Sequence, residues 1–95
     1  MRAIDPRIVA HLRSLVREDR SVSHALKTLH GMLPSDQRNM VAIIDYAKEA
    51  FCLTLHEASP IAGWDAEGAG EIPDERLDEL LVPAVTAHRS EWDRS

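Results

Sequence analysis

The sequence predicts an all-α fold, in which residues 1–95 form a compact single domain of four to five short helices. Hydrophobic residues recur with the 3.6-residue period of an amphipathic helix in four segments, and no alternating stretch is long enough to predict a strand. A chain of 95 residues, 44% of them hydrophobic, can bury one core. Aromatic residues make up only 4%, so we expect a helical bundle with a largely aliphatic core.

Capping residues mark the first two helices. Asp5 followed by Pro6 is typical of a helix start, because proline has no N–H to leave unpaired in the first turn. The apolar stripe that follows is Ile8, Val9, Leu12, Leu15 and Val16. Ser21 is the expected cap of a second helix, and Gly31 suits the left-handed position that closes it. The inward residues of this helix are Val22, Ala25, Leu26 and Leu29.

The third helix is expected to open at residues 34–36 and to be the longest. Its apolar stripe consists of Met40, Ile43, Ile44, Ala47 and Phe51. Thr54 and Glu57 then have the spacing of a capping box, which predicts the start of a fourth helix. Because Pro60 cannot continue that helix, it is either short or restarts with Ser59 as a new cap.

Glycine and acidic residues make residues 64–72 the main loop of the chain. We expect Trp64 to anchor this loop by packing its ring on the helices while its indole N–H finds an acceptor. The last helix begins near Pro73. Pro83 lies inside it, so we expect the helix to be kinked or split after Val82.

The formal net charge is −5, and it is unevenly distributed. Residues 1–50 carry 8 basic against 6 acidic residues, whereas residues 51–95 carry 3 against 10, giving +2 and −7. This balance argues against direct nucleic-acid binding. Cys52 is the single cysteine, which excludes an intramolecular disulfide. The start of the chain lacks the pattern of a signal peptide and no window is apolar enough for a membrane span, so we expect a cytoplasmic protein.

Catalytic and metal-binding constellations are weak in this sequence. The histidines are His11, His24, His30, His56 and His88, and no two of them have helical ligand spacing. His88 and Glu91 are three residues apart and could share a helix face, but two ligands do not make a site. Cys52 follows an apolar helix end, which favours a buried structural thiol. We therefore expect no enzyme activity, no metal and no cofactor.

A helix-turn-helix is conceivable over residues 21–50, with Arg13, Arg17 and Arg20 as a basic stripe. Three arginines are a thin footprint for DNA, and the turn is longer than usual. We therefore regard DNA binding as a minor alternative.

The strongest functional signal is a run of carboxylates that Arg76 alone opposes. It consists of Asp65, Glu67, Glu71, Asp74, Glu75, Asp78 and Glu79. Such an excess could be only a solvated face, or it could bind a basic protein partner together with Trp64. We expect the second, as in small bacterial inhibitors of the immunity or antitoxin kind that cover a basic active site, for instance that of a nuclease. The alternative is a regulatory or adaptor domain that could form a homodimer, in which exposed apolar residues near Trp64 and Trp92 make the contact.

Overall fold

The computed structural model describes residues 4–18 and 21–93, and it is all-α, as the sequence predicted. Two helices start at the expected caps: Asp5 accepts a hydrogen bond from the Arg7 backbone N–H (2.9 Å), and Ser21 accepts one from that of His24 (3.1 Å). In chain order, the helices are α1 (Pro6–Arg17), α2 (Val22–Met32), α3 (Met40–Phe51), α4 (Leu55–Ala58), α5 (Asp74–Ala87) and α6 (Arg89–Trp92), with 3₁₀ turns η1 (Ser35–Gln37) and η2 (Ser59–Gly63).

The boundary between α2 and α3 differs from the prediction. Gly31 lies inside α2, which continues to Met32, so the expected left-handed closure at Gly31 is wrong. Residues 34–36 do not open α3, because η1 forms there and Asn39 caps α3 instead, accepting from the Ala42 N–H at 2.9 Å. Met40 is consequently at the exposed first turn rather than in the core.

A left-handed residue does close a helix, but it is Cys52 at the end of α3 (φ 55°). The Leu53 N–H donates to the Lys48 carbonyl at 3.1 Å, which is the bond of a Schellman motif. The capping box that follows is confirmed, because Thr54 and Glu57 each accept a hydrogen bond from the other's backbone N–H. α4 is short and passes directly into η2, as the prediction from Pro60 requires.

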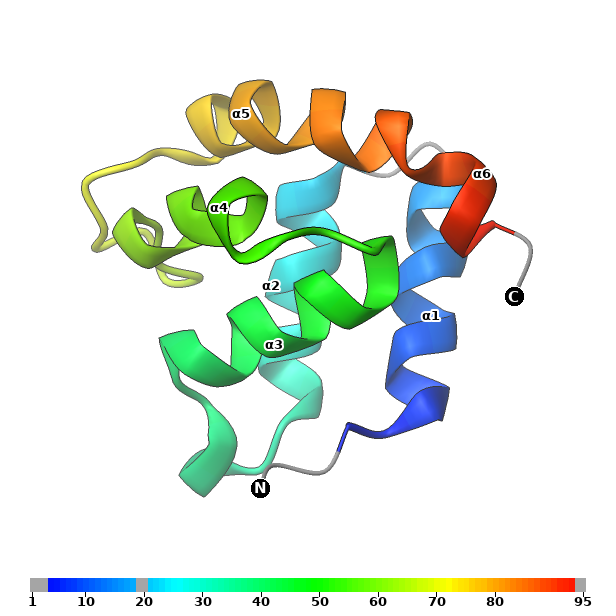
Figure 1. Cartoon of the computed structure of the whole chain (residues 1–95). Helices are drawn as coiled ribbons and strands as arrows, with labels where there is room; N and C mark the ends of the chain where they lie inside the picture. The colour runs from blue at the N-terminus through cyan, green and yellow to red at the C-terminus, as the bar shows by residue number, and fades with distance from the viewer. Residues whose placement is uncertain (1–3, 19–20, 94–95) are drawn as a thin grey trace.

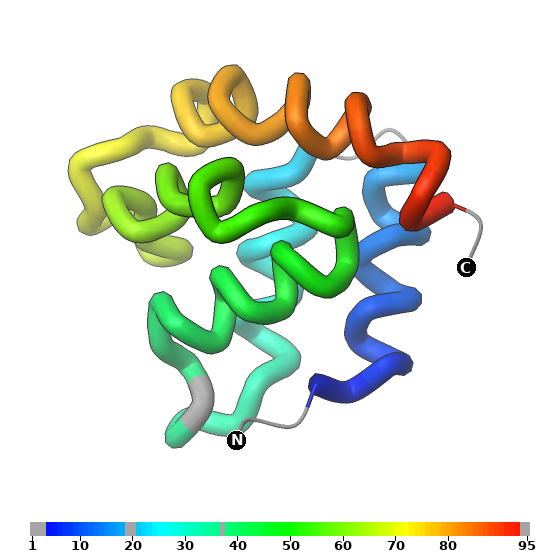
Figure 2. The backbone as a smooth tube through the Cα atoms, in the orientation of Figure 1, coloured from blue at the N-terminus to red at the C-terminus, as the bar shows by residue number. Residues whose placement is uncertain are grey.

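The helix that contains Pro83 is not split there. α5 is continuous across the proline and ends at Ala87, and the chain divides instead at His88, before α6. Leu77, Leu81 and Val85 are buried on both sides of the proline and hold the helix on the core. Figure 2 shows the path of the backbone from α5 into α6. At 14 residues α5, not α3, is the longest described helix.

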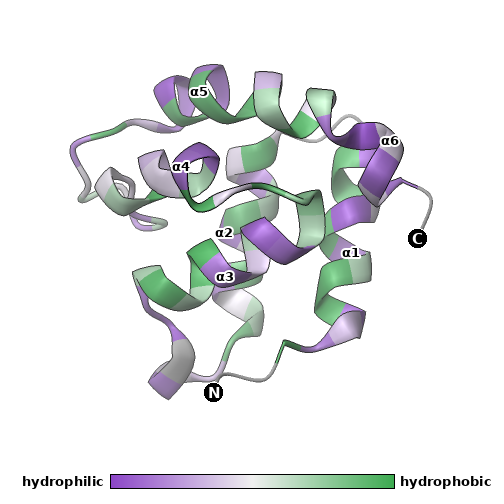
Figure 3. Ribbon diagram, in the orientation of Figure 1, coloured by the Kyte–Doolittle hydropathy of each residue, from purple (hydrophilic) through white to green (hydrophobic). Residues whose placement is uncertain are grey.

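The buried residues form one core. Figure 1 shows α5 lying across one end of the bundle above α4, with α6 turning back toward α1. Hydrophilic and hydrophobic residues alternate along the helices, as expected of amphipathic helices (Figure 3). The core includes all four aromatic side chains, Tyr46, Phe51, Trp64 and Trp92. None of the helices in residues 4–18 and 21–93 has the length and hydrophobicity needed to cross a membrane.

Candidate functional site

Trp64 anchors the start of the acidic segment, which we define as residues 64–79. Its ring is buried, with 6% of the residue exposed, and its Nε1–H donates to Asp74 Oδ1 at 2.9 Å. The predicted anchoring is therefore confirmed. The same burial removes Trp64 from the surface on which it was expected to meet a partner. Trp92 is fully buried as well, so neither tryptophan ring is itself exposed, and a contact through exposed apolar residues near them stays a prediction.

Asp74 has two internal partners. Besides the Trp64 indole, its carboxylate forms an ion pair with Lys27 of α2. The hydrogen bond from Lys27, and secondly that from Trp64, lower the pKa of Asp74 below its ordinary value. This carboxylate therefore ties the loop and the first turn of α5 to α2.

Asp78 connects the same two helices one turn further along α5. It accepts hydrogen bonds from the backbone N–H of Ser23 at 2.8 Å and from the Ser23 hydroxyl at 2.9 Å. Ser23 is buried in the first turn of α2, where backbone N–H groups lack helical acceptors. Asp78 thus supplies an acceptor and a negative charge to the N-terminus of another helix.

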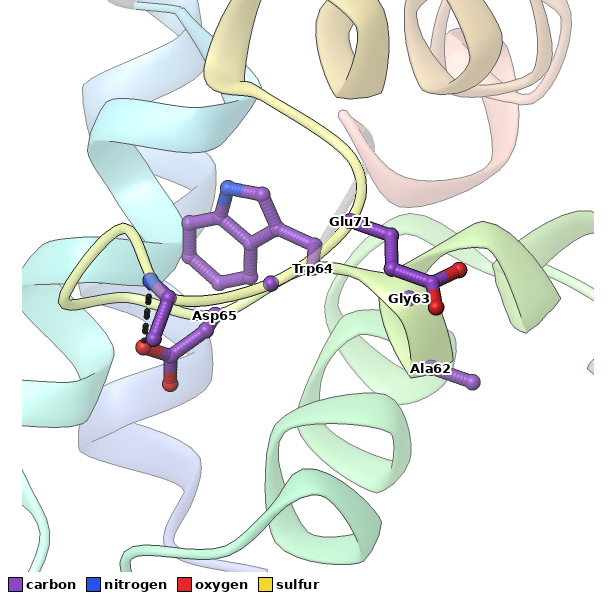
Figure 4. Close-up of a pocket in the computed structure, with 7 residues that line it drawn as sticks. Ala62, Gly63, Trp64, Asp65 and Glu71 are labelled. Atoms are coloured by element: carbon purple, nitrogen blue, oxygen red, sulfur yellow. Dashed lines mark hydrogen bonds between the residues drawn. The ribbon is translucent and has the colours of Figure 1, made fainter.

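Asp65 is engaged by its own loop. Its Oδ2 accepts from the backbone N–H groups of Glu67 (3.2 Å) and Ala69 (3.1 Å). The loop closes so tightly that a Cβ on Gly70 would come within 2.7 Å of the Asp65 backbone nitrogen. Figure 4 shows the pocket that this loop lines, with the Asp65 carboxylate turned back toward the loop and the Glu71 side chain extending the other way in this view, toward Gly63.

The four glutamates of the acidic segment remain exposed, and they are Glu67, Glu71, Glu75 and Glu79. Glu79 pairs with Arg76 on the same helix at 3.0 Å. Within the described part of the chain, no hydrogen bond or ion pair involves the carboxylates of the other three. The predicted surface of seven carboxylates therefore separates into three aspartates that serve the fold and four glutamates that face solvent.

A second surface feature is a groove between α5 and the α4–η2 segment. Its apolar walls include Pro60, Leu80, Pro83 and Ala84, and Glu57 lies along it. Pro83 is exposed here, so the proline contributes to a surface rather than to a helix break. No local sequence pattern indicates this groove, because it depends on how two helices cross.

Two of the three arginines in the expected basic stripe are used inside the fold. Arg13 donates to the carbonyls of Ala50 (2.7 Å) and Glu49 (3.2 Å) at the end of α3. Arg17 forms an ion pair with Asp93, and its guanidinium lies 5.7 Å from the Trp92 ring centroid. The third, Arg20, is outside the described residues. Two of the three arginines on which the helix-turn-helix alternative depends are therefore engaged within the protein.

A cluster of three titratable side chains forms around His88. It contains Glu91, which the sequence indicated as a neighbour of His88, and Glu57, which the sequence did not indicate. His88 contacts Glu91 through Nδ1 and Glu57 through Nε2, both at 3.0 Å. The spacing of His88 and Glu91 indicated the first contact. Glu57 is 31 residues away, so no local pattern could indicate the second. Across residues 4–18 and 21–93, no group of three or more His, Cys, Asp or Glu side chains is arranged to hold a metal ion.

Comparison with known proteins returned no relative. No protein-family model matches the chain, and no curated protein sequence or solved structure matches it either.

Proposed function

We propose that this chain is a non-enzymatic protein-binding module that uses the exposed glutamates of the acidic segment to meet a basic surface on another protein. The observation that carries the proposal is the separation of the carboxylates. Glu67, Glu71 and Glu75 are exposed and take part in none of the contacts described within the fold, although each adds to the repulsion within an already acidic segment. Like charges of this kind oppose folding slightly and favour the encounter with a partner of opposite charge.

Within this class, a small inhibitor of the immunity or antitoxin kind fits best. Such a protein needs a rigid scaffold and an acidic face, and it performs no chemistry of its own. The aspartates Asp65, Asp74 and Asp78 fix the backbone that presents the glutamates. A rigid presentation lowers the entropy that is lost on binding. The proposed partner is a basic protein such as a nuclease, and the proposed location is the cytoplasm.

The proposal predicts that association depends on the three unpaired glutamates. The test variant is Glu67→Gln, Glu71→Gln and Glu75→Gln. The control is Glu18→Gln, Asp36→Asn and Glu49→Gln, three exposed acids outside the segment. Both variants change the formal net charge from −5 by three units, to −2. We expect the test variant to associate roughly tenfold more slowly than the wild type at low salt, and the control to change little.

The partner is first captured from a lysate of the native host on tagged wild-type protein and identified by mass spectrometry. Its association rate constant is then measured with all three proteins at low and at physiological salt. The advantage of the wild type should shrink at physiological salt, because the Debye length falls to about 8 Å. If no basic protein is captured, or if both variants associate at the same rate, the proposal is wrong.

A second candidate is a regulatory or adaptor domain that binds through the groove between α5 and the α4–η2 segment. The observation that favours it is the apolar wall with Leu80 at its edge and Leu55 exposed on α4. If this groove served a homodimer, sedimentation equilibrium would give a dimer mass, and Leu80→Glu would return the monomer mass.

A further inference from the structure

His88 occupies the corner at which three helices meet. It ends α5 and precedes α6, and its ring lies between a carboxylate of α4 and a carboxylate of α6. Nε2 is 3.0 and 3.2 Å from the two carboxylate oxygens of Glu57, and Nδ1 is 3.0 Å from Glu91 Oε2. Both ring nitrogens therefore face hydrogen-bond acceptors.

The chemistry of imidazole makes this arrangement depend on one proton. An ionised carboxylate can only accept, and a neutral imidazole has a single N–H to donate. The imidazolium has two N–H groups, so only the protonated ring can donate to both carboxylates at once. When the proton leaves, one carboxylate faces a ring lone pair.

The two carboxylates are not equally fixed. Glu57 belongs to the capping box of α4, where its Oε1 accepts the Thr54 backbone N–H at 2.9 Å. Glu91 has a side chain that is 60% exposed, and it lies in a four-residue helix with no side-chain cap in the described structure. The remaining N–H of a neutral ring is therefore better placed to stay with Glu57, and Glu91 is the carboxylate that is released.

The other charged groups around this corner are engaged elsewhere or exposed. On α6, Arg89 pairs with Asp93 and lies over the Trp92 ring, and on α4, His56 is exposed beside the groove. On α2, Lys27 pairs with Asp74, and His24 is exposed. His30 lies toward the other end of the same helix. The η2 turn has no charged side chain. The last turn of α3 adds Lys48 and Glu49, and α3 meets α6 through the rings of Phe51 and Trp92. Glu57 and Glu91 are thus the charged partners of His88.

We propose that His88 is a proton-operated latch, which when protonated joins α4 to α6 across the end of α5 and when neutral keeps Glu57 and releases Glu91. α6 stays attached in both states, because Trp92 is buried against Phe51 and its Nε1–H donates to the Val85 carbonyl at 3.0 Å. The opening is therefore local. It concerns the first turn of α6, whose Glu91 and Trp92 N–H groups bond to the His88 carbonyl.

The direction of the switch follows from the environment of the ring. The hydrogen bonds to Glu57, and secondly to Glu91, raise the pKa of His88 above its ordinary value of 6.5. The stabilisation by the latch is therefore fully present below about pH 6.5 and is lost as the pH rises through the higher pKa of the folded protein. The latch is therefore closed below about pH 6.5 and opens as the pH rises through the raised pKa of His88.

The test is an NMR titration of the His88 ring in the wild type and in the variants Glu57→Gln and Glu91→Gln. Glutamine at position 57 can still complete the capping box, so this variant removes the charge without removing the cap. We expect the titration midpoint of His88 to fall in both variants, and to fall further with Glu57→Gln. Equal midpoints in all three proteins would overturn the proposal.

Amide exchange gives a second readout. Above pH 6.5 the Glu91 and Trp92 amides should lose protection in the wild type, after correction for the intrinsic pH dependence of exchange. His88→Gln should show constant protection, and His24→Gln, a control at an exposed position of α2, should behave as the wild type. Protection in the wild type that does not change with pH would also overturn the proposal, even if His88→Gln failed to fold.

Discussion

The acidic segment has an inner and an outer side, and they use carboxylates differently. On the inner side Asp65, Asp74 and Asp78 accept hydrogen bonds from the loop, from the Trp64 indole and from the first turn of α2. On the outer side all four glutamates are exposed, and the one described ion pair is that of Glu79 with Arg76. A cluster of like charges in the sequence is therefore not one surface.

Side-chain length accounts for part of this division. Aspartate holds its carboxylate close to the backbone, where it can accept from nearby N–H groups in turns and at helix starts. Asp65 does this within its loop. Asp78 does it across 55 residues, because the packing of α5 on α2 brings it to Ser23. The longer side chains of Glu75 and Glu79 on α5 are exposed to solvent instead.

The largest expected effect comes from breaking the inner side at Trp64. Trp64→Ala removes a buried ring and the donor to Asp74, and we expect a loss of about 3–5 kcal/mol in the free energy of unfolding, measured with urea. Trp64→Phe keeps most of the ring and should lose less. A loss below about 1 kcal/mol for Trp64→Ala would mean that the ring is not part of the core.

A smaller effect is expected at Asp78. Asp78→Ala leaves the Ser23 N–H without its acceptor in a buried helix start, and we expect a loss of about 1–3 kcal/mol. Asp78→Asn retains one carbonyl oxygen for the Ser23 N–H and should lose less. The control Glu75→Ala, on the outer face of the same helix, should stay within about 0.5 kcal/mol of the wild type. Equal losses for Asp78→Ala and Glu75→Ala would remove the distinction between the two sides.

Local chemistry explains which elements could be predicted. The caps at Asp5 and Ser21 and the capping box of Thr54 and Glu57 act over two or three residues, and all three were predicted correctly. Helix boundaries that depend on the rest of the fold were harder to predict from the sequence. Neither Asn39 nor the left-handed Cys52 was expected as the residue that bounds α3. Pro83 fits within α5 because packing on both sides of it outweighs one lost backbone bond.

The candidate site was predictable only in composition. The seven carboxylates could be counted, but Lys27 and Ser23, which engage Asp74 and Asp78, lie 47 and 55 residues from them. The same limit applies to Glu57 and His88. Periodicity indicates which face of a helix is buried, but not which other helix packs against it, so it could not separate the inner aspartates from the outer glutamates.

The central claim is that the aspartates hold the fold and that the unpaired glutamates do not. The direct test compares two triple variants of equal charge by thermal unfolding: Asp65→Asn, Asp74→Asn and Asp78→Asn against Glu67→Gln, Glu71→Gln and Glu75→Gln. We expect the glutamate variant to stay within about 0.5 kcal/mol of the wild type, since surface substitutions seldom do more. The aspartate variant should lose more than about 1 kcal/mol, which lowers the Tm by roughly 4–8 °C or more for a domain of this size. Equal Tm values for the two variants would contradict the account.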